Sequence, residues 1–333
     1  MDLVESLLSG NRLALSRLLT QVENDSPEGR AALSELFPHT GKAHLIGVTG
    51  APGTGKSSLV NQLALYYRKQ VDCTVAVVAV DPSSPFTGGA VLGDRVRMRD
   101  LSGDPNVFIR SMASRGSLGG LARTTAGLVQ VFDAAGFNLI FIETVGAGQS
   151  EVDVARLAHT TLVVEAPGMG DDIQAIKAGI LEIADILVVN KADRPGVENT
   201  LKALRNALEL AHPVQHVFKH HGQVQVADIP DVPAYNSWIP PIQKTISLDG
   251  TGIPELAAGI AKHETHLRQS GDWTARERNR LEAELNELIQ GALVARFRQD
   301  ISKNMYEETL EKVIQRELAP WEAVKSLLNG GAR

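Results

Sequence analysis

Residues 50–57 read GAPGTGKS, and this stretch decides the fold. It matches the phosphate-loop pattern G-x-x-x-x-G-K-[ST] in full, with the apolar run HLIGV (44–48) before it and the helix-like run SSLVNQLALYYRKQ (57–70) after it. Its glycines let backbone N–H groups face phosphate oxygens at a helix N-terminus, which attracts anions. We expect Lys56 to neutralise charge between the β- and γ-phosphates and Ser57 to offer its hydroxyl to Mg²⁺. The predicted phosphate contacts are Gly50, Ala51, Pro52, Gly53, Thr54, Gly55, Lys56, Ser57 and Ser58.

Short apolar runs alternate with helix-like stretches on both sides of this loop. Most runs are rich in Val and Ile and unbroken, which is typical of strands buried on both faces. The alternation predicts an α/β fold with a mostly parallel, doubly wound sheet of the P-loop NTPase type, whose ligands bind beyond the carboxyl ends of the strands. The predicted strands are HLIGV (44–48), TVAVVAV (74–80), NVFIR (106–110), LIFIET (139–144), TTLVVEA (160–166), ILVVNK (186–191) and KTIS (244–247).

A second motif, Asn190-Lys191-Ala192-Asp193, ends one of the predicted strands and indicates the base. Guanine presents two donors side by side, its ring N1–H and its exocyclic amine, and the Asp193 carboxylate can accept both. Adenine has a lone pair at N1, so the same carboxylate repels it. The stem of Lys191 can cover the base, and Asn190 can tie neighbouring loops together. A further base loop is predicted at Ser247, Leu248 and Asp249, whose backbone N–H groups would meet the guanine carbonyl; an ordinary turn is the alternative.

Acidic residues at two strand ends predict the Mg²⁺ site. Glu143 ends the strand LIFIE, where it can bind the ion through water or orient the attacking water. Asp81 ends another buried strand, and Asp94 follows soon after; a helix cap is the alternative reading of Asp94. Carboxylates beside phosphates are costly unless a cation holds them.

Catalysis in this class consists of positioning and charge neutralisation. We expect Lys56, Glu143 and Gly146 to carry it, with the Gly146 N–H on the γ-phosphate. Gln149 is a weaker candidate for positioning water. The arginines in the expected switch segments, Arg95, Arg97 and Arg115, are candidates for steadying transition-state charge, and surface ion pairs explain them as well. The sequence therefore predicts slow intrinsic GTP hydrolysis that a partner protein or the second copy in a dimer accelerates.

The predicted organisation has three parts: an N-terminal helical extension (1–40), a P-loop GTPase domain (41–265) and a C-terminal helical arm (266–333). Ser26 followed by Pro27 is a helix start within the first part. The last part carries an apolar helical stripe, which suits packing on the main domain and dimerisation equally well. The Pro-rich stretch 219–241 is predicted to be an irregular surface segment.

Composition excludes several classes of protein. The chain has 333 residues, a formal net charge of -6 and a single cysteine, Cys73. A mildly acidic chain is a poor candidate for nucleic-acid binding or polybasic membrane anchoring, and one cysteine excludes an internal disulfide. The longest apolar runs are too short to span a bilayer, and the N-terminus does not resemble a signal peptide. We expect a cytoplasmic protein with neither nucleic-acid nor membrane partners.

The whole set of motifs is more specific than a phosphate loop. In one order the chain contains GVTGAPGTGKSSL, AVDPSSPFTGGAVLGDRVRM, FIETVGAGQSEVDVA, GMGDDIQAIKAGILEIAD and VVNKAD, followed by the Ser-Leu-Asp loop. This set resembles the MeaB/ArgK group of P-loop GTPases, the chaperones of adenosylcobalamin-dependent acyl-CoA mutases. The resemblance covers most of the chain and is strongest between residues 46 and 193.

The resemblance implies a function and several residue roles. It implies a GTP-hydrolysing metallochaperone that gates cofactor loading and protects methylmalonyl-CoA mutase or a relative, and a homodimer joined by the C-terminal arm. It assigns Mg²⁺ to Ser57, Asp81, Asp94 and Glu143. It also implies a partner-sensing loop, here with Asp171 and Lys177 as polar contacts, where a helix N-cap is the local alternative. Leu248 departs from the more usual alanine, but that position acts through its backbone.

Two other functions compete with the mutase chaperone. A GTPase for metal delivery would need Cys and His clusters, and a single cysteine weighs against it. A kinase of an amino-acid transport component follows from older labels of the family and is the weaker interpretation.

Overall fold

The structure is a computed structural model that describes residues 2–82, 98–101, 103–114, 120–144, 150–168, 181–211, 218–220, 223–225 and 238–330. The helices are α1 (Leu3–Leu8), α2 (Arg12–Glu23), α3 (Pro27–Leu36), α4 (Lys56–Tyr66), α5 (Gly120–Ala134), α6 (Ser150–Leu157), α8 (Val197–Ala211), α9 (Ile253–Ser270), α10 (Asp272–Asp300), α11 (Lys303–Ile314) and α12 (Pro320–Gly330). Shorter helical turns are η1 (Phe37–His39), η2 (Tyr67–Val71) and η3 (Arg99–Leu101). The strands are β1 (His44–Thr49), β2 (Val75–Pro82), β3 (Val107–Ser114), β4 (Leu139–Thr144), β5 (Thr160–Glu165), β6 (Ile186–Val189), β7 (Phe218–His220), β8 (Gln223–Gln225) and β9 (Ile242–Lys244).

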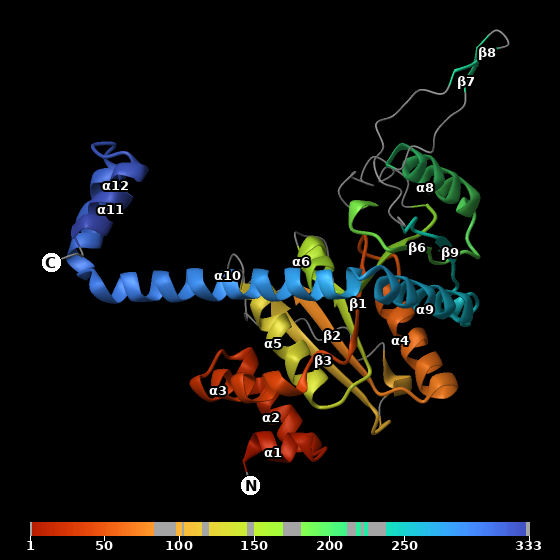
Figure 1. Cartoon of the computed structure of the whole chain (residues 1–333), viewed down its shortest axis with the longest axis horizontal. Helices are drawn as coiled ribbons and strands as arrows, with labels where there is room; N and C mark the ends of the chain where they lie inside the picture. Colours follow the sequence, from red (N-terminus) through yellow and green to blue (C-terminus); the bar gives the residue numbers. More distant parts are fainter. Residues whose placement is uncertain are drawn as a thin grey trace. The chain divides into compact units, whose positions relative to one another are not determined.

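The main sheet confirms the predicted fold class. Within the described residues it has seven strands in the order β3-β2-β4-β1-β5-β6-β9, and every neighbouring pair is parallel (Figure 1). β1 lies between β4 and β5, and the phosphate loop follows it directly. Because all seven strands run the same way, their carboxyl ends share one edge of the sheet, and the loops that follow them meet there.

Side chains from alternate strand positions feed two cores on opposite faces of the sheet. On β2, Ala76 and Val78 pack with α1, α2, α3 and α5, whereas Val75 and Val77 pack with α4 and α9. A third cluster joins β6 to α8. This double burial explains why the predicted strands read as unbroken apolar runs.

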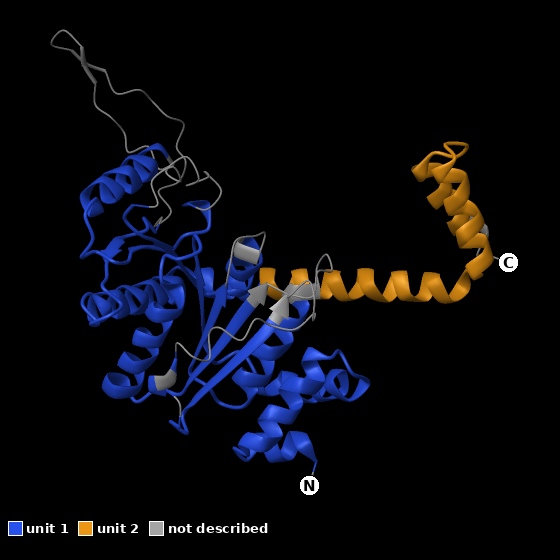
Figure 2. Cartoon of the chain, turned by 180° about the vertical axis from the view of Figure 1, so that it is seen from behind, with its two compact units in different colours: residues 1–278 blue, residues 279–333 orange. Residues whose placement is uncertain are grey.

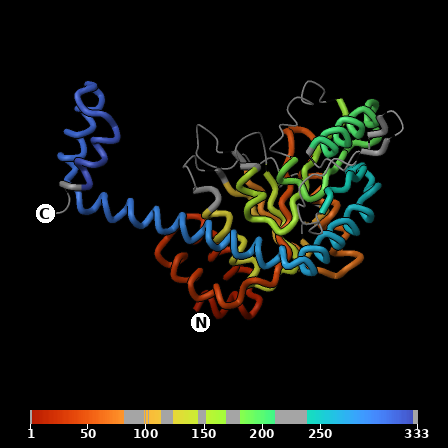
Figure 3. Tube along the Cα trace, turned by 45° about the horizontal axis from the view of Figure 1, so that its top comes forward, coloured from red at the N-terminus to blue at the C-terminus, as the bar shows by residue number. Residues whose placement is uncertain are grey.

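The N-terminal extension is helical, as predicted. Ser26 caps α3 by accepting a hydrogen bond from the Gly29 N–H at 3.0 Å, and Pro27 begins the helix. The helices α2 and α3 pack on α5, and α1 packs on α2 and α3 (Figure 3). Arg12 anchors α2 to the start of β3, with one guanidinium nitrogen 2.8 Å from the Val107 carbonyl oxygen.

Two predicted segments differ from the structure. The strand expected at 244–247 is displaced, because β9 ends at Lys244 and Ile246 then pairs with Thr251 across a tight turn. The segment 219–241 is not irregular throughout. β7 and β8 pair antiparallel and satisfy each other's backbone groups, so the prediction is wrong at those strands.

The chain divides into two compact units, residues 1–278 and 279–333 (Figure 2). The second unit contains most of α10, with α11 and α12, so the predicted C-terminal helices are present. Its helices expose large apolar side chains: Leu285, Leu288, Ile289, Leu293, Val294, Leu310, Ile314, Trp321, Val324 and Leu328. The boundaries 1–40, 41–265 and 266–333 and the role of the arm in dimerisation stay predictions. Among the described helices, each is too short or too polar to cross a bilayer.

A buried carboxylate anchors the first unit at the amino edge of the sheet. Asp185 precedes β6, accepts the Thr161 N–H at 2.8 Å and takes two hydrogen bonds from Arg276, at 2.7 and 2.8 Å. Burial alone would raise the pKa of Asp185, but hydrogen bonds from His263 and Arg276 outweigh it and lower the pKa to about 2. A depressed pKa means that folding favours the ionised carboxylate.

We expect Asp185→Asn to lower the free energy of unfolding at pH 7 by about 2 kcal/mol, the size of such a pKa shift. In the natural chain, the ionised Asp185 contributes this stability fully above the pKa of an unfolded aspartate, about 4. The contribution to stability is lost as the pH falls towards 2. In the variant, the free energy of unfolding should not show this part of its decrease with falling pH. Urea unfolding at a series of pH values measures both effects. Glu182→Gln, which changes an exposed carboxylate on the same turn, should keep the natural slope.

Candidate functional site

The phosphate loop has a backbone that only glycine fits at two points. Gly50 has φ 132°, and a Cβ there would lie 2.1 Å from the Val164 carbonyl oxygen of the neighbouring strand. Gly55 has φ 95°, and its Cβ would lie 2.5 Å from the Asn190 side-chain nitrogen. Gly55 is also the N-cap of α4 and makes no side-chain cap, which leaves the first-turn N–H groups of the helix to an anion.

The Lys56 side chain lies inside the phosphate loop. Lys56 begins α4, is 5% exposed, and its Nζ donates to the carbonyl oxygens of Gly50 at 2.7 Å and Ala51 at 3.1 Å. The positive charge therefore sits within the curve of the loop, beside the helix N-terminus. A polyphosphate that enters this curve meets an ammonium, a helix dipole and inward N–H groups together.

The predicted Mg²⁺ residues Ser57 and Glu143 lie side by side. The Ser57 hydroxyl donates to Glu143 Oε1 at 2.5 Å, and both side chains are buried. Glu143 reaches the site from β4, which pairs with β1, so strand order creates this contact. Two adjacent oxygen ligands at the mouth of a phosphate loop suit a hard cation such as Mg²⁺, and the donor set fits that ion.

The strand register places Asp81 at the same edge. Ala79 of β2 pairs with Glu143 of β4 and Val80 pairs with Thr144, so Asp81 lies two residues farther along β2 than the partner of Glu143. Only the backbone of Asp81 belongs to the described part of the chain. The other predicted residues lie outside the described residues altogether: Asp94, Arg95, Arg97, Arg115, Gly146, Gln149, Asp171 and Lys177.

Asn190 joins the phosphate loop to the base loop. Its side-chain nitrogen donates to the Thr54 carbonyl oxygen at 2.8 Å. Its Oδ1 accepts from the Ser247 hydroxyl at 2.8 Å, the Ser247 N–H at 3.2 Å and the Thr245 hydroxyl at 3.1 Å. The sequence indicated that Asn190 ties loops together, but it gave Thr245 no role. The structure shows that the Thr245 hydroxyl also donates a hydrogen bond to Asn190 Oδ1.

The other residues predicted to bind the guanine base follow Asn190 in the sequence or lie in the loop that Asn190 contacts. Lys191 has a left-handed backbone, φ 56°, and its Nζ donates to the Gly53 carbonyl oxygen at 2.5 Å, so its stem extends over the phosphate loop. Asp193 is exposed two residues later. In the opposite loop Leu248 is 87% exposed, while the Asp249 carboxylate accepts the Thr251 N–H at 2.9 Å, which lowers its pKa. Asn190, directly before Lys191, is hydrogen-bonded to Ser247, so the motif 190–193 and the loop 247–249 meet at this residue. The assignment of Lys191, Asp193 and the loop 247–249 to the base stays a prediction.

Gly252 is a second residue that the sequence analysis did not single out. It has φ 78°, and a Cβ there would lie 2.0 Å from the Lys244 carbonyl oxygen. This glycine closes the turn that contains the base loop, because only a residue without a side chain fits against β9. The signal was present as Gly250-Thr251-Gly252 directly after the loop.

Comparison with known proteins agrees with this geometry. The profile of a family described as Methylmalonyl Co-A mutase-associated GTPase MeaB matches residues 15–302. A protein of Pyrococcus abyssi that is named as a GTPase is 42% identical over 99% of this chain and 97% of its own. GTPase ArgK of Escherichia coli K12 is 32% identical over 97% and 94%. The Methylmalonic aciduria type A homolog, mitochondrial, of Caenorhabditis elegans is 31% identical over 84% and 69%.

A solved structure described as LAO/AO transport system kinase shares the architecture. It superposes with a TM-score of 0.67 at 25% identity and covers 98% of this chain and 95% of its own. The phosphate loop, the guanine motif, the parallel sheet and these relatives lead to one conclusion: the chain is a P-loop GTPase that belongs to the MeaB family of methylmalonyl-CoA mutase-associated GTPases.

Proposed function

We propose that this GTPase binds GTP with Mg²⁺, hydrolyses it slowly, and uses that cycle to gate cofactor loading of an adenosylcobalamin-dependent acyl-CoA mutase and to protect it. The observation that carries this proposal is the family match over residues 15–302, whose description names methylmalonyl-CoA mutase. The name of the nematode relative refers to methylmalonic aciduria, which concerns the same methylmalonyl group. The partner is methylmalonyl-CoA mutase or a close relative.

The chain's own residues divide the chemistry between them. Lys56 and the N-terminus of α4 bind the triphosphate, and Asp193 selects guanine. Ser57 and Glu143, together with Asp81 and Asp94, would hold Mg²⁺, which when bound neutralises charge on the β- and γ-phosphates. Glu143 orients the attacking water. Because catalysis in this class depends on neutralising the charge of the γ-phosphate, and Lys56 is the cation that the phosphate-loop motif supplies for this, we expect hydrolysis to be slow until a partner contributes more charge.

In this proposal a separate loop, outside the nucleotide-binding motifs, senses the mutase. The polar contacts are Asp171 and Lys177, and the homodimer forms through the C-terminal arm, whose apolar side chains are exposed. A large exposed apolar surface marks interaction sites, which supports an arm that meets a second copy.

The test is nucleotide-dependent binding to purified methylmalonyl-CoA mutase. We expect the Kd with a non-hydrolysable GTP analogue and Mg²⁺ to differ from the Kd with GDP by at least about fivefold, the lower end of allosteric coupling. Isothermal titration calorimetry measures both values. Lys56→Ala should bind the mutase without responding to nucleotide. Equal affinity in both nucleotide states would contradict the gating role.

A second candidate function comes from the description of the structural neighbour as a transport system kinase. A kinase transfers the γ-phosphate to a protein, whereas the proposed GTPase transfers it to water. Labelled γ-phosphate distinguishes them: release as inorganic phosphate supports the mutase chaperone, and stable label on a protein substrate supports the kinase.

A further inference from the structure

A pocket of about 460 Å³ opens at the amino edge of the sheet, at the opposite end of β1 from the phosphate loop. This volume is within the range of small-molecule sites, about 300 to 1,000 Å³. The walls of the pocket come from the first residues of β1 and β4, from the end of α4 with η2, and from α9. The residues assigned to the nucleotide follow the carboxyl ends of the strands, so this pocket is separate from the nucleotide site.

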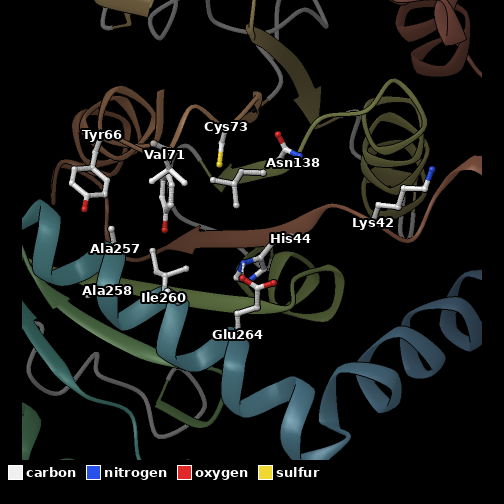
Figure 4. Close-up of a pocket in the computed structure, with 13 residues that line it drawn as sticks. Lys42, His44, Tyr66, Val71, Cys73, Asn138, Ala257, Ala258, Ile260 and Glu264 are labelled. Atoms are coloured by element: carbon white, nitrogen blue, oxygen red, sulfur yellow. Dashed lines mark ion pairs between the residues drawn. The ribbon is translucent and has the colours of Figure 1, made fainter. Parts of the chain in front are cut away.

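The pocket has an apolar end and a polar end. In Figure 4, Tyr66, Val71 and Ala257 lie at one end, and Asn138 and Lys42 lie at the other. An apolar wall with a few polar groups is the usual composition of a site for a small organic molecule.

The helix α9 turns one face toward the pocket. Ala257, Ile260, Ala261 and Glu264 line it, at the three- and four-residue spacing of one helical face. The two alanines end at Cβ, so they leave space that larger side chains on the same face would fill. Leu139 of β4 adds an apolar surface from the sheet. This lining suits the apolar part of a ligand.

Tyr67 brings a buried hydrogen-bond donor to this pocket. The residue is 8% exposed, and its ring packs against Tyr66 at 5.8 Å and Phe141 at 6.3 Å between ring centroids. Within the part of the chain that the structure describes, its hydroxyl makes no hydrogen bond. The hydroxyl is not enclosed by protein on every side, so a partner can reach it from the pocket that Tyr67 lines. Because buried polar groups nearly always have a partner, this hydroxyl points to a molecule in the pocket that accepts from it.

The backbone around Tyr67 supports a role in binding. Tyr67 begins η2, a single turn of π-helix that continues α4 and ends before Asp72, whose backbone is left-handed at φ 54°. Such turns are rare and are frequently found at functional sites. Here the π-turn carries both Tyr67 and Val71 into the wall of the pocket.

The charges around the pocket favour an uncharged ligand. Burial is the main cause that raises the pKa of Tyr67, and the negative charge of Glu264 is among the further causes, so another anion beside this hydroxyl is disfavoured. Glu264 is ionised, because the hydrogen bond from His44 is the largest influence on its pKa and helps to lower it to about 2. Its Oε1 already accepts from Arg268 at 2.9 and 3.1 Å, so the carboxylate does not require a cationic ligand.

We propose that this pocket binds an uncharged carbonyl compound with an apolar body, that is, a ketone, an ester, an amide or a thioester. The carbonyl oxygen accepts the hydrogen bond from the Tyr67 hydroxyl, and the apolar body lies along Ile260 and Leu139. A carbonyl group suits this site because it accepts a hydrogen bond without carrying a charge. The binding is reversible and involves no chemical step.

Acetophenone and cumene are matched probes for this site, because they have nearly the same shape and differ in the carbonyl group. Cys73 reports their binding, since it is the single cysteine of the chain, is free and lines the pocket. Burial raises the pKa of its thiol, so its reaction with N-ethylmaleimide near neutral pH is slow enough to follow. We expect acetophenone to protect Cys73 at a concentration about tenfold lower than cumene, because cumene leaves a buried donor unpaired.

Two controls show where the probes act. Neither probe should change the reaction rate of the chain unfolded in urea, which excludes an effect on the reagent. Saturating GDP with Mg²⁺ should leave the protection of the folded chain unchanged, because the nucleotide site is at the other edge of the sheet. Displacement of acetophenone by GDP would place the ketone in the nucleotide site and overturn the proposal.

A matched pair of variants tests the hydrogen bond itself. Tyr67→Phe removes the buried hydroxyl and keeps the ring, whereas Tyr66→Phe makes the same change at the neighbouring, half-exposed tyrosine, which water can reach. The preference for acetophenone over cumene should disappear in Tyr67→Phe and remain about tenfold in Tyr66→Phe. The same preference in both variants would overturn the proposal, as would a natural chain that neither probe protects.

Charged analogues of similar size test whether the ligand is uncharged. Benzoate carries a negative charge and benzylamine a positive one, so both should protect Cys73 less well than acetophenone does. Equal protection by either analogue would contradict an uncharged ligand.

Discussion

Replacing Lys56 with alanine should reduce GTP hydrolysis by at least about 100-fold, the scale on which single transition-state donors act. Lys56 places its ammonium 2.7 Å from the Gly50 carbonyl oxygen and is almost fully buried, so its positive charge lies inside the phosphate loop. Release of phosphate under single-turnover conditions with saturating enzyme gives the rate. Titration calorimetry gives the affinity for GTP, which should fall with it.

Lys69→Ala provides the control for this variant. Lys69 lies in η2, directly after the C-terminal end of the helix that Lys56 begins, and it is exposed. It carries the same charge but is distant from the loop along the helix, so its rate should stay close to that of the natural chain. If Lys56→Ala hydrolysed GTP at the natural rate, the loop would not hold the triphosphate as described.

Replacing Asp193 with asparagine should change which purine is preferred. Two hydrogen bonds to a charged acceptor contribute about 3 kcal/mol together, so the GTP affinity should fall by about 100-fold. Xanthine carries an oxygen where guanine carries its amine, and the asparagine amide can donate to that oxygen. The affinity for xanthosine triphosphate should therefore rise as that for GTP falls. Competition against a fluorescent guanine nucleotide measures the two values in one series.

Glu198→Gln is the matched control for the base variant, since it neutralises an exposed carboxylate in the first turn of α8, shortly after Asp193. It should leave the preference for guanine unchanged. Parallel loss of affinity for both purines in Asp193→Asn would indicate a general electrostatic or folding effect. That outcome would place the base elsewhere.

The sheet and the phosphate loop were predictable because their signals are local. A strand buried on both faces reads as a continuous apolar run, and the glycines of the loop are adjacent in sequence. The end of β9 was predicted wrongly because Thr245 and Ser247 continue a β-branched and polar pattern, yet their hydroxyls bond to Asn190 and turn the chain out of the sheet. The β-propensity of a short segment depends on its own residues, so it does not reveal a hydrogen-bond partner on another strand.

The hydrogen bonds of the Thr160 hydroxyl with His44 and His263, at the amino edge of the sheet, were beyond prediction for the same physical reason. His44 and Thr160 are separated by 116 positions and Thr160 and His263 by 103, so only the completed sheet brings them together. Each histidine alone resembles an ordinary core residue. The contact between Ser57 and Glu143 was easier to expect, because the sequence assigned both residues to the same Mg²⁺ ion.

The bridge made by Asn190 has a consequence for ligands smaller than a nucleotide. A nucleoside or a free triphosphate engages only one of the two loops, whereas the intact nucleotide engages both loops, which the Asn190 amide ties together. Each fragment loses its own translational and rotational freedom on binding while making only part of the contacts. The site therefore binds fragments of the nucleotide weakly. The binding free energies of the fragments, added together, are smaller than that of the intact molecule.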